Sequence, residues 1–197
     1  MNKTTRVIAA FIAAMMLMCG FAGCSIPEPA DEGEMLAAAK TLLESAVEVN
    51  RIFFWEGLPH EEPAEDKLDV GDSEYLVLTE DYMYLMESDL MAKAEAVYSE
   101  AYCKDIEKIA FEGIKVTEDE ALFARYIVEQ GIMKINRKLS EEGLSERLPD
   151  TSTMETVSIT HNTAVVSVSF TGEGVTEKQE IKLVLEDDGW RLDTPTY

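Results

Sequence analysis

Apolar side chains recur at alternating steps of four and three residues in the first part of the chain, which is the spacing of one face of a helix. The residues of this stripe are Met35, Ala39, Leu42, Ala46, Val49 and Phe53. The stripe predicts a helix that starts at Glu34. Gly57 and Pro59 follow it and are expected to end it, because both residue types interrupt a helix.

The middle of the chain is predicted to combine a loop, a short strand and further helices. Residues 60–70 are rich in Glu, Asp and Pro, which favours a loop, and a short strand is expected at 75–79. Ser88 is a suitable N-cap for a second helix, and a third, short helix is expected to lead to Gly113. The apolar residues that mark these helices are Leu90, Ala94, Val97 and Ala101, and then Ile106 and Ile109.

Strand patterns dominate the last part of the chain. Apolar runs at 126–128 and 132–135 flank Glu129-Gln130-Gly131, and a glycine in that place is typical of a β-hairpin turn. Alternating apolar and small or polar residues at 164–170 and 181–185 predict half-buried strands on either side of Gly172-Glu173-Gly174. Strands at 154–160 and 190–192 complete a C-terminal antiparallel meander.

This order of elements indicates an α+β fold. We expect N-terminal helices packed on a curved antiparallel sheet that ends in a C-terminal β-meander. No internal repeat is visible, so residues 34–197 are expected to form a single domain. Residues 24–33 are polar and contain Pro27 and Pro29, which predicts a flexible tether ahead of that domain.

The first residues have the composition of an export signal. Lys3 and Arg6 precede an apolar run, 7–19, that is too short to span a bilayer, and small residues follow it. Together with Phe21-Ala22-Gly23-Cys24, this pattern resembles a bacterial lipoprotein signal, although Phe21 replaces the leucine usual in that family. The resemblance implies that residues 1–23 are removed and that Cys24 carries a diacylglycerol thioether. It places the protein on the outer face of the bacterial cytoplasmic membrane.

The net charge of −22 limits the classes of partner. Residues 1–23 carry two basic and no acidic side chains, so the exported chain would have a net charge of −24. Like charges repel, which argues against nucleic acid and anionic polymers as ligands and favours a cationic partner. The alternative interpretation of this acidity is a solvated surface that prevents aggregation.

No motif for catalysis or metal binding is present in the sequence. Cys103 is the one cysteine left after Cys19 and Cys24, and we expect it to be structural. His60 and His161 are expected on the surface, and neither belongs to a zinc-binding pattern. We therefore expect no catalytic residue, metal or cofactor, although a buried carboxylate with a raised pKa would leave no trace in the sequence.

Candidate binding residues lie in the last turn of the predicted first helix and in the loop that follows it. Phe54 and Trp55 point away from the apolar stripe on a helical projection, so they would line a pocket or a binding surface, or else belong to a core buried on several sides. Glu61 and Glu62, in the acidic loop that follows, are candidate contacts for a cationic partner.

The element order over residues 34–197, with the ending Gly189-Trp190-Arg191-Leu192-Asp193-Thr194-Pro195-Thr196-Tyr197, resembles the nuclear-transport-factor-two-like superfamily. That resemblance implies a bent antiparallel sheet wrapped by helices. The combination of Ser88-Asp89-Leu90, a hairpin at 126–136 and the final Trp strand is also similar to secreted inhibitors of cell-wall DL-endopeptidases, although no inhibitory residue can be carried over.

Two functions follow as hypotheses. The first is a lipid-anchored, non-catalytic binding or inhibitory module that acts on a cationic cell-envelope protein or a small apolar ligand. The second is an enzyme of the isomerase or dehydratase kind, because the superfamily that the chain resembles includes such enzymes; it would use one carboxylate inside the cone that the bent sheet and its helices form.

Overall fold

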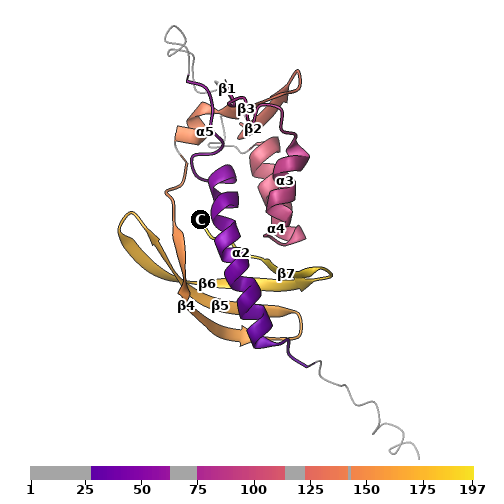
Figure 1. The fold of residues 1–197 in the computed structure, drawn as a ribbon, viewed down its shortest axis with the longest axis vertical. Coiled ribbons are helices and arrows are strands. Elements are labelled where there is room, and N and C mark those ends of the chain that lie inside the picture. The colour runs from indigo at the N-terminus through magenta and orange to yellow at the C-terminus, as the bar shows by residue number, and fades with distance from the viewer. Residues whose placement is uncertain (1–27, 63–74, 114–122, 142) are drawn as a thin grey trace, which may run out of the picture.

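A computed structural model describes residues 28–62, 75–113, 123–141 and 143–197 (Figure 1). The predicted signal peptide, Cys24, the first part of the tether and most of the predicted loop at 60–70 lie outside these residues. The described elements confirm the α+β class: helices pack against antiparallel sheets.

Helix α2 (Glu32–Phe53) is the longest helix of the described chain, and its predicted stripe is buried throughout. It begins two residues earlier than expected, because the carboxylate of Asp31 accepts a hydrogen bond from the Glu34 amide at 2.8 Å and caps the helix. The Ala30 amide also donates to the Thr160 carbonyl at 3.0 Å, so the chain joins the fold before position 34. After Phe53 the backbone leaves the helix, and Gly57 has a φ of 83°.

A four-stranded antiparallel sheet forms the C-terminal meander, as predicted. Its strands are β4 (Leu148–Ile159), β5 (Thr163–Gly172), β6 (Val175–Glu186) and β7 (Gly189–Leu192), in that spatial order. Helix α2 crosses one face of this sheet (Figure 1). Strand β4 starts six residues before the predicted 154–160, and two register shifts along it blur the alternation of side chains in the sequence.

A second, smaller sheet lies at the C-terminal end of α2 (Figure 1). It contains β1 (Tyr75–Val77), β2 (Tyr126–Glu129) and β3 (Ile132–Asn136) in the order β1-β3-β2, and α5 (Arg137–Glu141) follows it. The predicted hairpin is confirmed, with Gly131 at a φ of 79° in its turn. Strand β3 of the hairpin also pairs with β1, so the hairpin belongs to the smaller sheet and not to the sheet of the meander.

The prediction of one helix from Ser88 to Ala101 is wrong, because the chain forms α3 (Glu87–Glu95) and α4 (Glu100–Glu107) with a break between them. In the break the Ser99 amide donates to the Leu192 carbonyl at 2.8 Å, and the Leu192 amide donates to the Val97 carbonyl at 3.0 Å. These bonds occupy the free edge of β7, which would otherwise leave buried backbone groups unpaired.

The helix boundaries follow from local caps. The Asp89 carboxylate accepts from the Met86 amide at 2.8 Å, so α3 begins before Ser88, which was the predicted N-cap. The Ser99 hydroxyl accepts from the Tyr102 amide at 3.2 Å and caps α4. The expected third helix is α4 itself, which continues as a π-helix, η2 (Lys108–Glu112), up to Gly113.

Trp190 closes the core at the start of β7, where its side chain is 6% exposed and pairs across the sheet with Leu185. We expect Trp190→Ala to lower the free energy of unfolding by about 3–5 kcal/mol, because it removes a large buried ring and leaves a cavity. Urea titration measures this change. Val157→Ala, at a site that is 52% exposed, is the control and should cost less than about 0.5 kcal/mol. Equal effects of the two substitutions would contradict the placement of Trp190.

Candidate functional site

A groove of about 750 Å³ lies between α3, α4 and the turn that joins β6 to β7. It exists because the pairing of Val97 and Ser99 with Leu192 holds both helices beside that turn. Its volume is within the range of ligand-binding clefts. The acidic side chains that line it are Glu87, Glu95, Glu100, Glu107, Glu186 and Asp188.

The apolar part of the groove includes Met91, Tyr98 and Cys103, all of them largely buried. Tyr98 is fixed from beneath: its hydroxyl lies 2.7 Å from Oδ1 of Asn50 and 2.6 Å from Oγ1 of Thr196. Burial raises the pKa of Tyr98 far above its usual value, so the phenol stays neutral. The apolar side of the groove is therefore rigid and uncharged.

The charges around the groove are unbalanced, because two basic side chains, Lys104 and Arg191, face six acidic ones. Lys104 pairs with Glu100 at 2.9 Å, and its hydrogen bond and charge lower the pKa of that carboxyl. Arg191 pairs with Asp188 at 2.5 Å.

Of the remaining four acids, Glu186 accepts a hydrogen bond from the Glu100 amide at the N-terminus of α4, at 3.0 Å. Within the described ranges, Glu87, Glu95 and Glu107 have neither a hydrogen bond nor an ion pair through their carboxylates. Three carboxylates are thus available to a cation.

The surroundings of Cys103 in this groove are buried and negatively charged. Its thiol is free and 6% exposed, with Sγ 3.6 Å from the Tyr98 carbonyl. Burial, followed by the charges of Glu95 and Glu186, raises the pKa of Cys103 to about 11. A neutral, covered thiol is a poor nucleophile, which agrees with the expected structural role.

A second hollow, of about 410 Å³, lies on the other flank of α4. The rings of Phe54 and Tyr197 stack there with centroids 3.7 Å apart and planes inclined by 23°, and the Tyr102 hydroxyl donates to the Tyr197 hydroxyl at 2.9 Å. We call this site the aromatic hollow. It is lined by Phe54, Tyr102, Asp105, Ile106, Lys108, Ile109, Pro195 and Tyr197.

The structure separates the two aromatic candidates. Phe54 is 7% exposed and lines the aromatic hollow, as a pocket residue would. Trp55 is 1% exposed, so of the two interpretations of this residue, core or binding surface, its burial supports the core. The helical projection failed because α2 ends at Phe53; beyond it, the Trp55 carbonyl accepts a hydrogen bond from Arg125.

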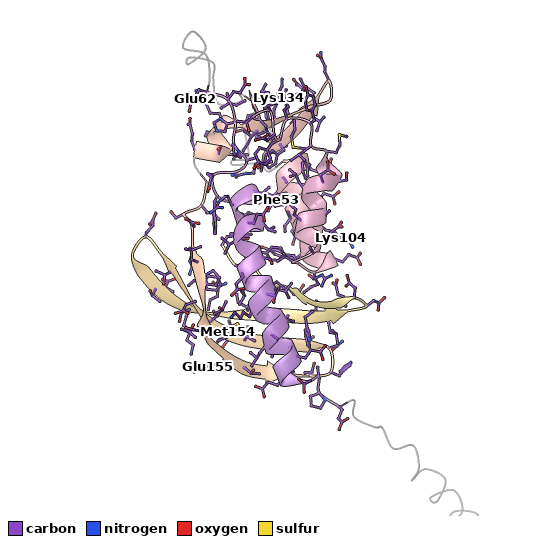
Figure 2. All side chains as sticks on the ribbon, in the orientation of Figure 1. Phe53, Glu62, Lys104, Lys134, Met154 and Glu155 are labelled. Atoms are coloured by element: carbon purple, nitrogen blue, oxygen red, sulfur yellow. The ribbon has the colours of Figure 1, made fainter. Side chains whose placement is uncertain are left out.

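Glu61 and Glu62 are exposed, but they do not line the groove. The Glu61 amide donates to the Val77 carbonyl at 2.9 Å, which holds this segment against β1. Figure 2 shows Glu62 beside the smaller sheet and Lys104 on α4, in different parts of the molecule. A partner in the groove would therefore meet other carboxylates than the pair predicted from the sequence.

Among the described residues, none of the buried polar or charged side chains is an Asp or Glu. The buried charged residue there is Arg125, at 5% exposure. Within the same ranges no group of His, Cys, Asp and Glu side chains could hold a metal ion. His161 is exposed in the turn between β4 and β5, and His60 is half-buried beside Leu78.

No helix in the described part of the chain is both long enough and apolar enough to cross a membrane.

The acidic groove itself was not predicted from the sequence. One signal was available, because Glu100, Cys103 and Glu107 are spaced by three and four residues and so share a flank of a helix. The contribution of Glu186 and Asp188 depends on tertiary packing, for which the sequence carried no local signal.

The raised pKa of Cys103 leads to a chemical prediction. At pH 8 roughly one thiol in a thousand would be ionised, so alkylation by iodoacetamide should be at least tenfold slower in the folded protein than in 8 M urea. Mass spectrometry of a Cys24→Ser chain that starts at residue 24 follows Cys103 alone. Equal rates with and without urea would contradict both the burial and the negative surroundings of the thiol.

Comparison with known proteins assigns no family to this chain. No family model matches it, and no curated protein matches it.

Proposed function

We propose that the protein is a lipid-anchored, extracytoplasmic binding or inhibitory module that holds a cationic segment of a cell-envelope protein in its acidic groove and performs no catalysis. The observation that carries the proposal is the set of unpaired carboxylates, Glu87, Glu95 and Glu107, around the apolar side of the groove. A Lys or Arg side chain would suit this site, because its aliphatic stem would contact the apolar side of the groove while its charged end would pair with the carboxylates.

The energetics favour fast capture. Each exposed ion pair contributes at most about 1 kcal/mol, so the carboxylates alone would not give a tight complex. The field of a strongly acidic chain nevertheless accelerates the approach of a cationic partner, by roughly ten- to a thousandfold at low ionic strength. Charge in the groove should therefore govern association, while apolar contacts nearby govern the lifetime of the complex.

Membrane attachment is proposed from the N-terminal sequence. Cys24 precedes the start of α2 by eight residues, which would span about 30 Å at most. A diacylglycerol on Cys24 supplies two acyl chains, and two chains are enough for stable membrane residence. Such a tether would keep the groove close to the cell surface, where envelope proteins are found.

The enzyme hypothesis finds less support. An isomerase or dehydratase of the kind considered needs a carboxylate inside the fold with a raised pKa. The inner face of the meander is instead filled by Ala164, Val166 and Val168 on β5, all at most 1% exposed, beneath α2. No buried Asp or Glu occurs among the described residues.

The first test compares the groove with the acidic loop. We expect the double charge reversal Glu95→Lys/Glu107→Lys to reduce capture of envelope proteins by an immobilised chain starting at Ser25 roughly tenfold at low salt. The matched control Glu61→Lys/Glu62→Lys changes the net charge equally but lies outside the groove, so it should reduce capture at most twofold. Quantitative mass spectrometry of the captured proteins measures both effects.

Capture by the unchanged protein should also weaken as salt rises to 0.15 M, where the Debye length is about 8 Å. Circular dichroism would first establish that both variants fold. Equal losses for the two double variants would show that overall charge is responsible and would remove the groove from the account. Capture of no protein at low salt, with turnover of a small substrate, would favour the enzyme.

The second test concerns the anchor. Cys24→Ala should abolish lipid attachment and leave the precursor unprocessed, because the thiol is the attachment atom. Metabolic labelling with a fatty acid measures the outcome, and Cys103→Ala, which keeps Cys24, should label as the unchanged protein does. Label that persists in Cys24→Ala would refute the lipoprotein assignment without touching the proposal for the groove.

A further inference from the structure

Helix α4 separates the acidic groove from the aromatic hollow. At 100° per residue, Glu100, Cys103 and Glu107 share one flank and line the groove, whereas Tyr102 and Ile106 lie on the opposite flank and line the hollow. Between the two flanks runs an exposed ridge. Its residues are Ala101, Lys104 and Asp105 of α4 and Lys108 at the start of η2; Lys104 also borders the groove, and Asp105 and Lys108 also border the hollow.

Because this ridge is exposed, both depressions open on the solvent side of the same helix. The two sites differ in chemistry. The groove has an excess of carboxylates, while the polar residues of the hollow, Asp105 and Lys108, carry opposite charges that offset each other. The remaining wall of the hollow is apolar or aromatic: three aromatic rings, of which two stack, and the side chains of Ile106, Ile109 and Pro195. A cation is therefore favoured on one flank and a large apolar side chain on the other.

We infer that the partner straddles α4, with a Lys or Arg side chain in the acidic groove and a large apolar side chain in the aromatic hollow. The inference rests on the proposed function and narrows its partner to an extended protein segment that carries both side chains. A small molecule of 410 Å³ or less would fill the hollow but would not reach across the ridge.

The width of a helix sets the spacing of the two side chains. An α-helix with its side chains is about 10–12 Å across, so the two anchors must be about that far apart. In a polyproline-type segment, residues three apart lie on the same side and are separated by about 9 Å. In a β-strand, residues four apart share a side and are separated by about 13 Å. The partner should therefore carry the basic and apolar residues three or four positions apart.

Selection from a library of random 12-residue peptides tests this inference without knowledge of the natural partner. The target is the chain from residue 24 onward, which contains every described residue, and selection is done at low ionic strength. We expect enrichment of peptides with one basic and one large apolar residue at a fixed separation of three or four. A synthetic peptide of that kind should lose roughly tenfold in affinity when either residue is replaced by alanine.

Variants of the protein assign each anchor to its site. Glu107→Lys should remove the preference for the basic residue and keep the apolar one, and Tyr197→Ala should do the reverse. Glu180→Lys, an exposed charge reversal on β6 outside both sites, should change neither preference. Urea midpoints establish that the variants are folded; if Tyr197→Ala is unfolded, Ile109→Ser tests the same hollow.

The outcomes separate this inference from the proposed function. Enrichment of basic residues without an apolar residue at a fixed separation would overturn the inference that one segment occupies both sites, and it would leave the groove proposal in place. Enrichment of apolar residues alone, or of no pattern, would overturn both. Enrichment at a fixed spacing that is unaffected by Glu107→Lys and Tyr197→Ala would place the peptide elsewhere and overturn the inference.

Discussion

The edge pairing of residues 97–99 with β7 determines most of what is distinctive in this structure. Two backbone hydrogen bonds to Leu192 cover the end of the meander and interrupt a sequence that would otherwise continue as one helix. The same segment places Tyr98 against Asn50 of α2 and Thr196 of the C-terminal segment, where the three side chains form a buried hydrogen-bonded cluster. Helix, sheet and C-terminal segment are thereby joined at one point.

Both candidate sites follow from this junction. The break between α3 and α4 allows the two helices to line a groove with the β6–β7 turn, and the C-terminal segment, tied through Ser99 and Asp193, forms a wall of the aromatic hollow. The carboxylates that face each other in the groove repel, which is unfavourable for the free protein. A bound cation would relieve that repulsion. We base the proposal of a binding function on these walls and on the unpaired charge between them.

Features that depend on residues close together in the sequence were predicted, whereas features that depend on distant residues were not. The stripe from Met35 to Phe53, the hairpin at Gly131 and the alternation along β5 are local patterns, and each element was found. The break at Ser99 was missed because it depends on β7, more than ninety residues away. For Trp55 the sequence left core and binding surface open, because the helical projection was extended past the last residue of α2 and could not show on which side the ring lies.

The central claim is that the groove between α3, α4 and β7 is where a cation binds, and not the acidic surface in general. Titration of the isotopically labelled protein with a trilysine peptide, followed by backbone amide NMR, tests it directly. We expect saturable shifts concentrated at Glu95, Glu107 and the β6–β7 turn, with small changes elsewhere. Shifts spread evenly over the acidic surface, or centred on Glu61 and Glu62, would contradict it.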